Sequence, residues 1–325
     1  MRKPNFIIVG APKAGTTSLH YYLDQHPNVF MSKFKEPHYF ASDMYAGARF
    51  IKSEKAYLKL FSKSKPEHTM IGEASVLYLY SRVAIDNIRR FNPDTKIIVM
   101  LRNPVELVHA FWAELLHGFE EDQHNFQTAW ELQDKRLSGE NIPESCRCPE
   151  QLQYRSLFLL GQQMEKLYSI FPKEQVHICM FDQYKENTTG EFNKILDFLG
   201  LRQGFDIDFS VQNKNFSYPR NGLVHFIFRP PGWAAPVIEA LKDMFISKRD
   251  IIADILMNKF ARVEARQPLD PEFINTLKKY FRADIRLLEG LIGTDIKHWY
   301  QTKPQLERGY TRSYCAHCSR DQSFL

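Results

Sequence analysis

The 325-residue sequence contains no apolar run long enough to cross a lipid bilayer. The first apolar segment has only four or five residues before Gly10, too few for a secretory signal. The most apolar later stretch, 223–238, is interrupted by Arg229, Pro230 and Pro231. We therefore expect a cytoplasmic protein without a membrane span.

Cysteine is scarce, and the odd count of five argues against a disulfide scaffold. Cys146 and Cys148 form a C-x-C pair and Cys315 and Cys318 a C-x-x-C pair, whereas Cys179 stands alone. Together the two pairs could bind zinc through four thiolates, but C-x-C spacing is poor for such a site. We therefore predict no metal site.

The chain also lacks a strong charge bias. It has 43 Lys and Arg residues against 38 Asp and Glu, a net charge of +5. This surplus suits a pocket for a small polyanion and is too small to indicate a nucleic-acid partner. Hydrophobic residues make up 44% and charged residues 25%, which excludes a disordered, coiled-coil or collagen-like chain.

Short apolar runs alternate with amphipathic segments in the first third of the chain. The β-branched runs at 5–9 and 96–101 predict buried strands, and helical spacing follows at 19–23 and 104–116. This alternation is typical of parallel sheets. We predict an α/β fold of the P-loop-like, three-layer type, with a central parallel sheet flanked by helices.

The rest of the chain continues this pattern. Apolar spacing predicts helices at 154–171, 192–199 and 270–288 and a strand at 176–180. We expect one domain over residues 1–300. Within it we expect a mainly helical elaboration at about 205–268, and after it a C-terminal tail at 301–325.

Residues 10–18, G-A-P-K-A-G-T-T-S, combine glycines, a lysine and hydroxyls directly before a predicted helix. The pattern resembles the phosphate loop G-x-x-x-x-G-K-[ST], but Lys13 lies inside the loop and Thr16 takes the usual lysine position. Backbone N–H groups at a helix N-terminus, with hydroxyls and one ammonium, bind tetrahedral anions. A βα turn alone would explain the glycines but not the lysine and hydroxyls, so we predict an anion-binding loop.

The residue that follows the strand at 96–101 separates two classes of enzyme. A kinase needs its lysine beside the helix start and an acidic strand-end residue that holds Mg²⁺. Here the strand is followed by Arg102. An arginine offers a bidentate fork for a second phosphate, or it forms only a structural salt bridge.

These elements together resemble the sulfotransferases that use 3′-phosphoadenosine 5′-phosphosulfate (PAPS). Residues 10–19 are similar to their 5′-phosphosulfate loop, and 99–106, V-M-L-R-N-P-V-E, to their 3′-phosphate element. Lys-Glu-Pro-His-Tyr-Phe at 35–40 is similar to the bacterial and heparan-sulfate-like branch. The similarity extends over about residues 4–300 and includes the segments 171–175, 196–201 and 269–299.

The resemblance implies in-line sulfuryl transfer from PAPS, with adenosine 3′,5′-bisphosphate as the product and no metal required. Lys13 would bind the bridging oxygen of the leaving group, and Arg102 would bind the 3′-phosphate. The loop residues implied in donor binding are Lys13, Ala14, Gly15, Thr16, Thr17 and Ser18.

The acceptor must lose a proton as it attacks, so the reaction needs a base. The resemblance implies Glu36 for this role, with His38 as the alternative base. A surface pairing of Glu36 with Lys33 or Lys35 would instead leave it without a catalytic part.

The sequence departs from the family pattern at two positions. Ala110 stands where the family has a serine that contacts the 3′-phosphate, so His109 or Arg220 would have to supply the contact. Glu73 occupies a position where this branch often has Glu before Lys, but the next residue here is Ala74.

The acceptor is a small molecule, a lipid-like molecule or a glycan. Several aromatic residues could line a cleft for a hydrophobic acceptor, although each could equally belong to the core: Tyr39, Phe40, Phe111, Trp112 and Trp233. The basic segment around Lys214 and Arg220 would suit an acidic glycan instead. Two other functions remain open, namely a P-loop kinase and a non-catalytic protein that binds adenosine bisphosphate.

Overall fold

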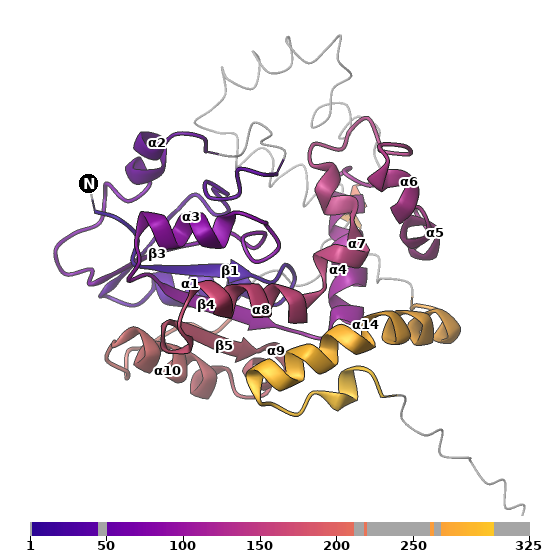
Figure 1. Cartoon of the computed structure of the whole chain (residues 1–325). Helices are drawn as coiled ribbons and strands as arrows, with labels where there is room; N and C mark the ends of the chain where they lie inside the picture. The colour runs from indigo at the N-terminus through magenta and orange to yellow at the C-terminus, as the bar shows by residue number, and fades with distance from the viewer. Residues whose placement is uncertain (1, 45–50, 211–217, 220–260, 263–267, 302–325) are drawn as a thin grey trace, which may run out of the picture.

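The computed structural model describes residues 2–44, 51–210, 218–219, 261–262 and 268–301. Its centre is an all-parallel, five-stranded sheet with the order β2-β3-β1-β4-β5 (Figure 1). The strands are β1 (Phe6–Gly10), β2 (Val29–Met31), β3 (Met70–Ala74), β4 (Lys96–Leu101) and β5 (Val176–Met180).

The predicted parallel sheet and the strands at 5–9, 96–101 and 176–180 are confirmed. All residues of β1 are buried, as the run of apolar residues predicts for a strand covered on both faces. Sequence reasoning missed β2 and β3. β2 has only three residues, and in β3 a glycine and a glutamate interrupt the run of apolar residues that would indicate a strand.

Helices lie on both sides of the sheet and give a three-layer α/β arrangement (Figure 1). The main helices are α1 (Thr16–Asp24), α2 (Glu54–Lys59), α3 (Ala84–Phe91), α4 (Pro104–His117), α8 (Leu160–Ile170), α9 (Phe181–Glu186), α10 (Thr188–Leu199) and α14 (Pro271–Ile292). Shorter elements are α5 (Phe126–Glu131), α6 (Gln133–Leu137), α7 (Tyr154–Leu157), η1 (Pro149–Leu152), η2 (Lys173–Gln175), η4 (Lys297–Trp299), β6 (Tyr218–Pro219) and β7 (Ala261–Arg262). Among the residues that the structure describes, no helix is both long and apolar enough to cross a membrane.

One helical prediction needs correction. The helix predicted at 154–171 is divided into α7 and α8, because Asp284 of α14 accepts the backbone N–H groups of Gly161 and Gln162 and so starts a new helix there. Residues 205–210 form no helix, and the helical elaboration expected at about 205–268 stays a prediction. Most of the remainder of that segment and the tail at 302–325 lie outside the described residues.

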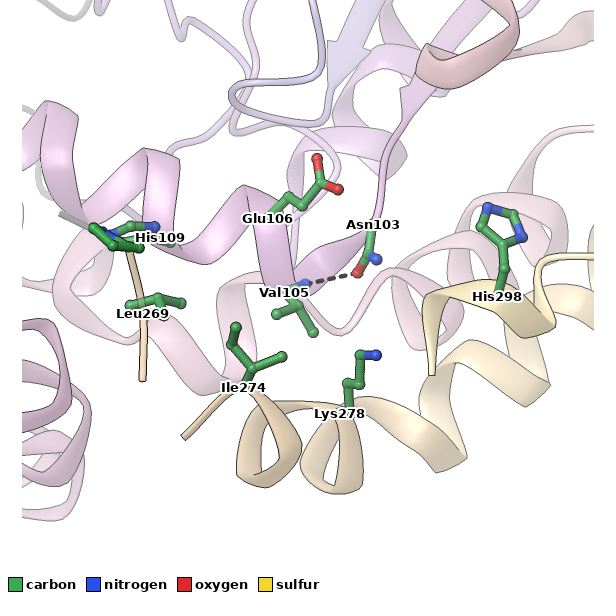
Figure 2. Close-up of a pocket in the computed structure, with 9 residues that line it drawn as sticks. Asn103, Val105, Glu106, His109, Leu269, Ile274, Lys278 and His298 are labelled. Carbon is green, nitrogen blue, oxygen red and sulfur yellow. Dashed lines mark hydrogen bonds between the residues drawn. The ribbon is translucent and has the colours of Figure 1, made fainter. Parts of the chain in front are cut away.

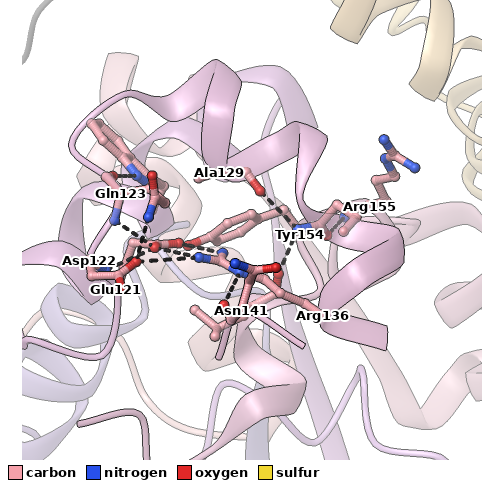
Figure 3. Close-up of polar contacts among 11 residues, drawn as sticks. Glu121, Asp122, Gln123, Ala129, Arg136, Asn141, Tyr154 and Arg155 are labelled. Atoms are coloured by element: carbon pink, nitrogen blue, oxygen red, sulfur yellow. Dashed lines mark hydrogen bonds and ion pairs between the residues drawn. The ribbon is translucent and has the colours of Figure 1, made fainter. Parts of the chain in front are cut away.

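The segment between α4 and α8, residues 118–159, forms an excursion from the sheet layers that is fixed by a buried ion pair (Figure 3). Both terminal nitrogens of Arg136 lie 2.6 Å from the carboxylate of Glu121, and neither side chain is exposed. The Tyr154 hydroxyl donates to the same carboxylate over 2.6 Å. Two backbone N–H groups also donate to this carboxylate. Because every charge is paired and hydrogen-bonded, this network fixes the excursion in one geometry against α7.

The parallel pairing brings the functional segments together. β1 pairs with β3 on one side and with β4 on the other. The carboxyl ends of these strands therefore meet at one edge of the sheet, where ligands bind in open α/β folds. The loop at 10–18, Glu73 and Arg102 all lie at this edge.

Candidate functional site

The loop at 10–18 joins β1 to α1 in the form expected of an anion site. Lys13 and Gly15 both have left-handed backbone conformations, with φ of 63° and 91°. A Cβ atom at Gly15 would lie 3.2 Å from the ring of Phe181, so only glycine fits there without movement. Gly15 caps α1 without a side chain, so no side chain competes with an anion for the first-turn N–H groups of Thr16, Thr17 and Ser18.

The two predicted phosphate elements are in direct contact. The carbonyl of Lys13 accepts a hydrogen bond from Nη1 of Arg102 over 3.3 Å. The Lys13 ammonium lies 3.5 Å from Oε2 of Glu114, which projects from α4. Sequence reasoning did not identify Glu114, because helical spacing does not show which part of α4 faces the loop. Burial raises the pKa of Glu114, and the charge of Lys13 opposes that rise.

The guanidinium of Arg102 is held by hydrogen bonds along its edge and by an aromatic ring on its face. Its Nε and Nη2 donate to Oε2 of Glu106 over 3.0 and 2.7 Å, and its guanidinium lies 4.4 Å from the centre of the Phe181 ring. The structural salt bridge considered above is therefore present. With the bond to Lys13 it uses three of the five guanidinium N–H groups, so two have no partner in the described part of the chain. Two N–H groups on a fixed guanidinium suit a phosphate.

Glu36 lies in the loop that follows β2, and its side chain is 36% exposed. Its Oε1 lies 2.5 Å from the ammonium of Lys35, and its Oε2 lies 3.4 Å from Nε2 of His38. Burial alone would raise its pKa, but the hydrogen bond from His38 and the charge of Lys35 outweigh it and lower the pKa to about 2. Lys33 pairs with Asp24, so the pairing of Glu36 considered above is present with Lys35 and not with Lys33.

The candidate base is close to the candidate leaving-group lysine. The charges of Lys13, Glu36 and Lys35 all act on Glu114, so the four side chains form one cluster. His38 joins this cluster through Glu36, and its side chain is only 4% exposed. Glu36, and through it His38, thus lies within electrostatic range of Glu114, the partner of Lys13, although more than twenty residues separate both from Lys13 in the sequence.

A pocket of about 510 Å³ lies between α4 and α14 (Figure 2). Its lining includes Glu106, which holds Arg102, and it also includes His109. The lining residues are Asn103, Val105, Glu106, His109, Pro268, Leu269, Ile274, Lys278 and His298. Ala110 is buried in α4 and does not line the pocket. Of the two residues proposed to replace the missing serine, His109 is thus near Arg102, and Arg220 lies outside the described residues.

The aromatic candidates belong largely to the core. Phe40, Phe111 and Trp112 are buried, and Tyr39 stacks on Tyr57 with ring centres 4.5 Å apart. Trp233 and Lys214 lie outside the described residues.

The cysteines do not form a metal centre within the described ranges, where no group of three or more His, Cys, Asp or Glu residues could hold an ion. Cys148 is buried and Cys146 is half-buried, and burial raises the pKa of Cys146 to about 11. Cys315 and Cys318 fall in the tail that the structure does not describe.

The fold and these contacts define an α/β protein with Lys13 and Arg102 in adjacent elements that follow β1 and β4. A family model for the sulfotransferase domain matches residues 3–222, and the chain belongs to this family. Mouse carbohydrate sulfotransferase 15 is 26% identical over 246 residues, which cover 61% of this chain and 44% of that protein. Mouse heparan sulfate glucosamine 3-O-sulfotransferase 3B1 is 26% identical over 242 residues, which cover 72% of this chain and 57% of that protein.

The chain thus spans about half the length of the curated relatives it matches. A solved sulfotransferase from Alicyclobacillus acidocaldarius superposes with a TM-score of 0.68 at 24% identity, over 93% of this chain and all of that one. This similarity supports the three-layer fold.

Proposed function

We propose that this protein transfers the sulfuryl group of PAPS to a hydroxyl or amine of an acceptor and releases adenosine 3′,5′-bisphosphate. The observation that carries the proposal is the contact between Arg102 and the loop carbonyl of Lys13. This contact joins the arginine that follows β4 to the backbone of the loop that follows β1, so both elements belong to one site, as a donor with a phosphosulfate and a 3′-phosphate requires. Membership of the sulfotransferase family supports the same activity.

In this proposal the chain holds the donor at two points. The N–H groups of the first turn of α1, with the hydroxyls of Thr16, Thr17 and Ser18, bind the 5′-phosphate. The two remaining N–H groups of Arg102 bind the 3′-phosphate. Lys13 neutralises the negative charge that grows on the bridging oxygen as the sulfur–oxygen bond breaks.

The proton of the acceptor passes to Glu36. As the acceptor oxygen or nitrogen bonds to sulfur, it becomes more acidic, and the sulfur bond to the bridging oxygen breaks on the opposite side. A carboxylate with a pKa of about 2 is ionised throughout the physiological range and is a weak base. Proton transfer therefore occurs late, after the new bond has begun to form.

For the acceptor we propose a chemical class and not an individual molecule. Relatives named for carbohydrate and for heparan sulfate glucosamine support a glycan hydroxyl as the first acceptor to test, ahead of a small or lipid-like molecule. A cytoplasmic location stays a prediction from the sequence.

Calorimetric titration tests the donor site. Adenosine 3′,5′-bisphosphate should bind equally well with and without Mg²⁺, and more tightly than ATP. Incubation with sulfur-labelled PAPS and a panel of glycan, phenol and amine acceptors then tests transfer.

The two other functions give different results. A kinase would prefer Mg²⁺-ATP in the titration, and that result would overturn the family-based proposal. A non-catalytic binder would bind the bisphosphate and transfer no label to any acceptor.

A further inference from the structure

Glu73 is a buried carboxylate that the proposed reaction does not use. It lies in β3 with no exposed surface, and no Lys, Arg or His of the described residues forms an ion pair with it. A buried charge without a cation is costly, so its hydrogen bonds must compensate. Glu73 lies at the edge of the sheet that carries the candidate site, so its hydrogen-bond partners bear on the site.

Three hydroxyl groups surround this carboxylate. Ser75 Oγ donates to Oε2 over 2.8 Å and Tyr57 donates to Oε1 over 3.1 Å, and the Tyr78 hydroxyl lies close enough to lower the pKa of the carboxyl. The hydroxyl hydrogens of Ser75 and Tyr57 are thus directed toward Glu73, which leaves the oxygen lone pairs of these hydroxyls to accept from other groups.

Two of these hydroxyls accept from the loop of the candidate base, residues 36–40. Ser75 Oγ accepts the backbone N–H of His38 over 3.1 Å, and the Tyr78 hydroxyl accepts that of Phe40 over 3.4 Å. The N–H of Glu36 is bound to the carbonyl of Ala74 over 3.0 Å. Alternate N–H groups of the 36–40 loop are thus fixed to residues 74–78.

The 36–40 loop needs such support because its backbone is unfavourable. Glu36 and His38 both lie in the left-handed region, with φ of 60° and 49°, although neither is glycine. Residues other than glycine keep this conformation only where the surroundings impose it. The bond from His38 to Ser75 acts at one of the two strained positions.

We propose that Ser75, oriented by the Glu73 carboxylate, is a positioning residue that holds the 36–40 loop so that Glu36 and His38 face Lys13. The proposal rests on the function proposed above, and it assigns a role to two residues that do not contact the reacting groups. It explains why a carboxylate without a cation is kept inside β3.

Hydrogen–deuterium exchange of the full chain tests the positioning without any acceptor. In Ser75→Ala the peptide that covers 33–41 should exchange about tenfold faster than in the wild type, as the loss of one positioning hydrogen bond implies. Tyr57→Phe is the matched control, because it removes a hydrogen bond to the same carboxylate but none to the loop. It should leave this peptide unchanged, and equal exchange in all three proteins would overturn the proposal.

Turnover with PAPS gives the second readout. Ser75→Ala should lower kcat about tenfold with unchanged binding of adenosine 3′,5′-bisphosphate, and Ser75→Thr should restore kcat because it keeps the hydroxyl. If Ser75 acts through Glu36, its substitution should cost little more in a Glu36→Gln background. Full additivity of the two effects would contradict the proposal.

Two further outcomes are distinguishable. If Ser75→Ala does not fold, Ser75→Cys has nearly the same volume with a weaker acceptor and should show a smaller change of the same sign. If the wild type transfers no sulfuryl group, the proposed function fails, while the exchange measurement still decides whether Ser75 fixes the loop.

Discussion

Lys13 is the residue with the most direct part in the proposed chemistry. Replacing it by alanine removes the ammonium that offsets charge on the leaving oxygen, so kcat should fall by about a hundredfold or more. Lys13→Arg keeps the charge with a different shape and should retain more activity. The measurement is turnover of labelled PAPS at saturating donor, and wild-type turnover in Lys13→Ala would exclude the proposed role.

The roles of Glu36 and of the nearby carboxylate of Glu114 can be distinguished by substitution. Glu36→Gln removes the base and should lower kcat about a hundredfold while the dissociation constant of the bisphosphate stays the same. Glu114→Gln is the matched control, since it removes a nearby carboxylate that contacts Lys13 and not the acceptor proton. Steady-state kinetics and calorimetry on both variants distinguish the roles, and an effect of Glu36→Gln on binding alone would contradict the assignment to catalysis.

Glu73 should make the stability of the protein depend on pH. Burial raises its pKa from 4.5 to about 7, so between these values the folded protein binds a proton that the unfolded chain releases. The free energy of unfolding should therefore decrease as pH rises from 4.5 to 7, by about 3 kcal/mol in total. Denaturant unfolding at pH 5 and pH 8 should show this loss in the wild type and not in Glu73→Gln. The same slope in both proteins would mean that Glu73 is not the cause.

At the scale of secondary-structure elements, one side chain joins two helices. Asp284 of α14 accepts the N–H groups of Gly161 and Gln162 over 2.8 and 2.9 Å and so caps α8 from outside. A Cβ at Gly161 would lie 2.3 Å from the Asp284 carbonyl, which shows how closely the two helices approach. This contact fixes α14, which lines the pocket beside Arg102.

Asp284→Ala should lower the free energy of unfolding by about 2 to 4 kcal/mol, because two buried N–H groups lose a charged acceptor. Asp284→Asn should cost less, since one amide oxygen still accepts. Lys279→Ala on the exposed side of α14 is the control and should change stability by less than about 0.5 kcal/mol. Thermal or urea unfolding monitored by circular dichroism measures all three, and equal stability of Asp284→Ala and the control would refute the cap.

At the scale of the whole molecule, each site cation already has a carboxylate partner. Lys13 pairs with Glu114, Lys35 with Glu36, and Arg102 with Glu106. In the proposed complex the donor therefore binds to cations whose charges are already partly neutralised, through N–H groups such as the two of Arg102 that make no bond within the described residues. The Glu106 and Glu114 side chains are 52% and 44% exposed, so water screens their two ion pairs.

Because ligand binding favours the folded state, adenosine 3′,5′-bisphosphate at a hundred times its dissociation constant should stabilise the chain by about 2.7 kcal/mol. A chelator should not change this value, because Arg102 stands where a Mg²⁺-dependent enzyme keeps an acidic residue. Thermal shift assays with the bisphosphate, with and without chelator, measure the effect. Stabilisation that disappears with chelator would favour a metal-dependent nucleotide site.

The local signals in the sequence predicted a large part of the site. The glycines, lysine and hydroxyls at 10–18 and the arginine after β4 carry their chemistry within short segments, so an anion loop and a phosphate-binding Arg102 can be predicted without a structure. The missed strands β2 and β3 have weak local signals, since three residues or a central Gly-Glu pair do not show the usual apolar run. The division between α7 and α8 depends on a side chain more than 120 residues away.

The sequence by itself determined the parallel α/β class and the family, and it predicted the two phosphate elements, because periodicity and motif spacing are properties of neighbouring residues. Only the tertiary structure decided that Arg102 contacts the loop of Lys13, that Glu114 joins the cluster, and that Glu73 and Ser75 support the 36–40 loop. These contacts join residues from different strands and helices. They arise from the order in which parallel strands pair, because this order places the strand ends at one edge of the sheet.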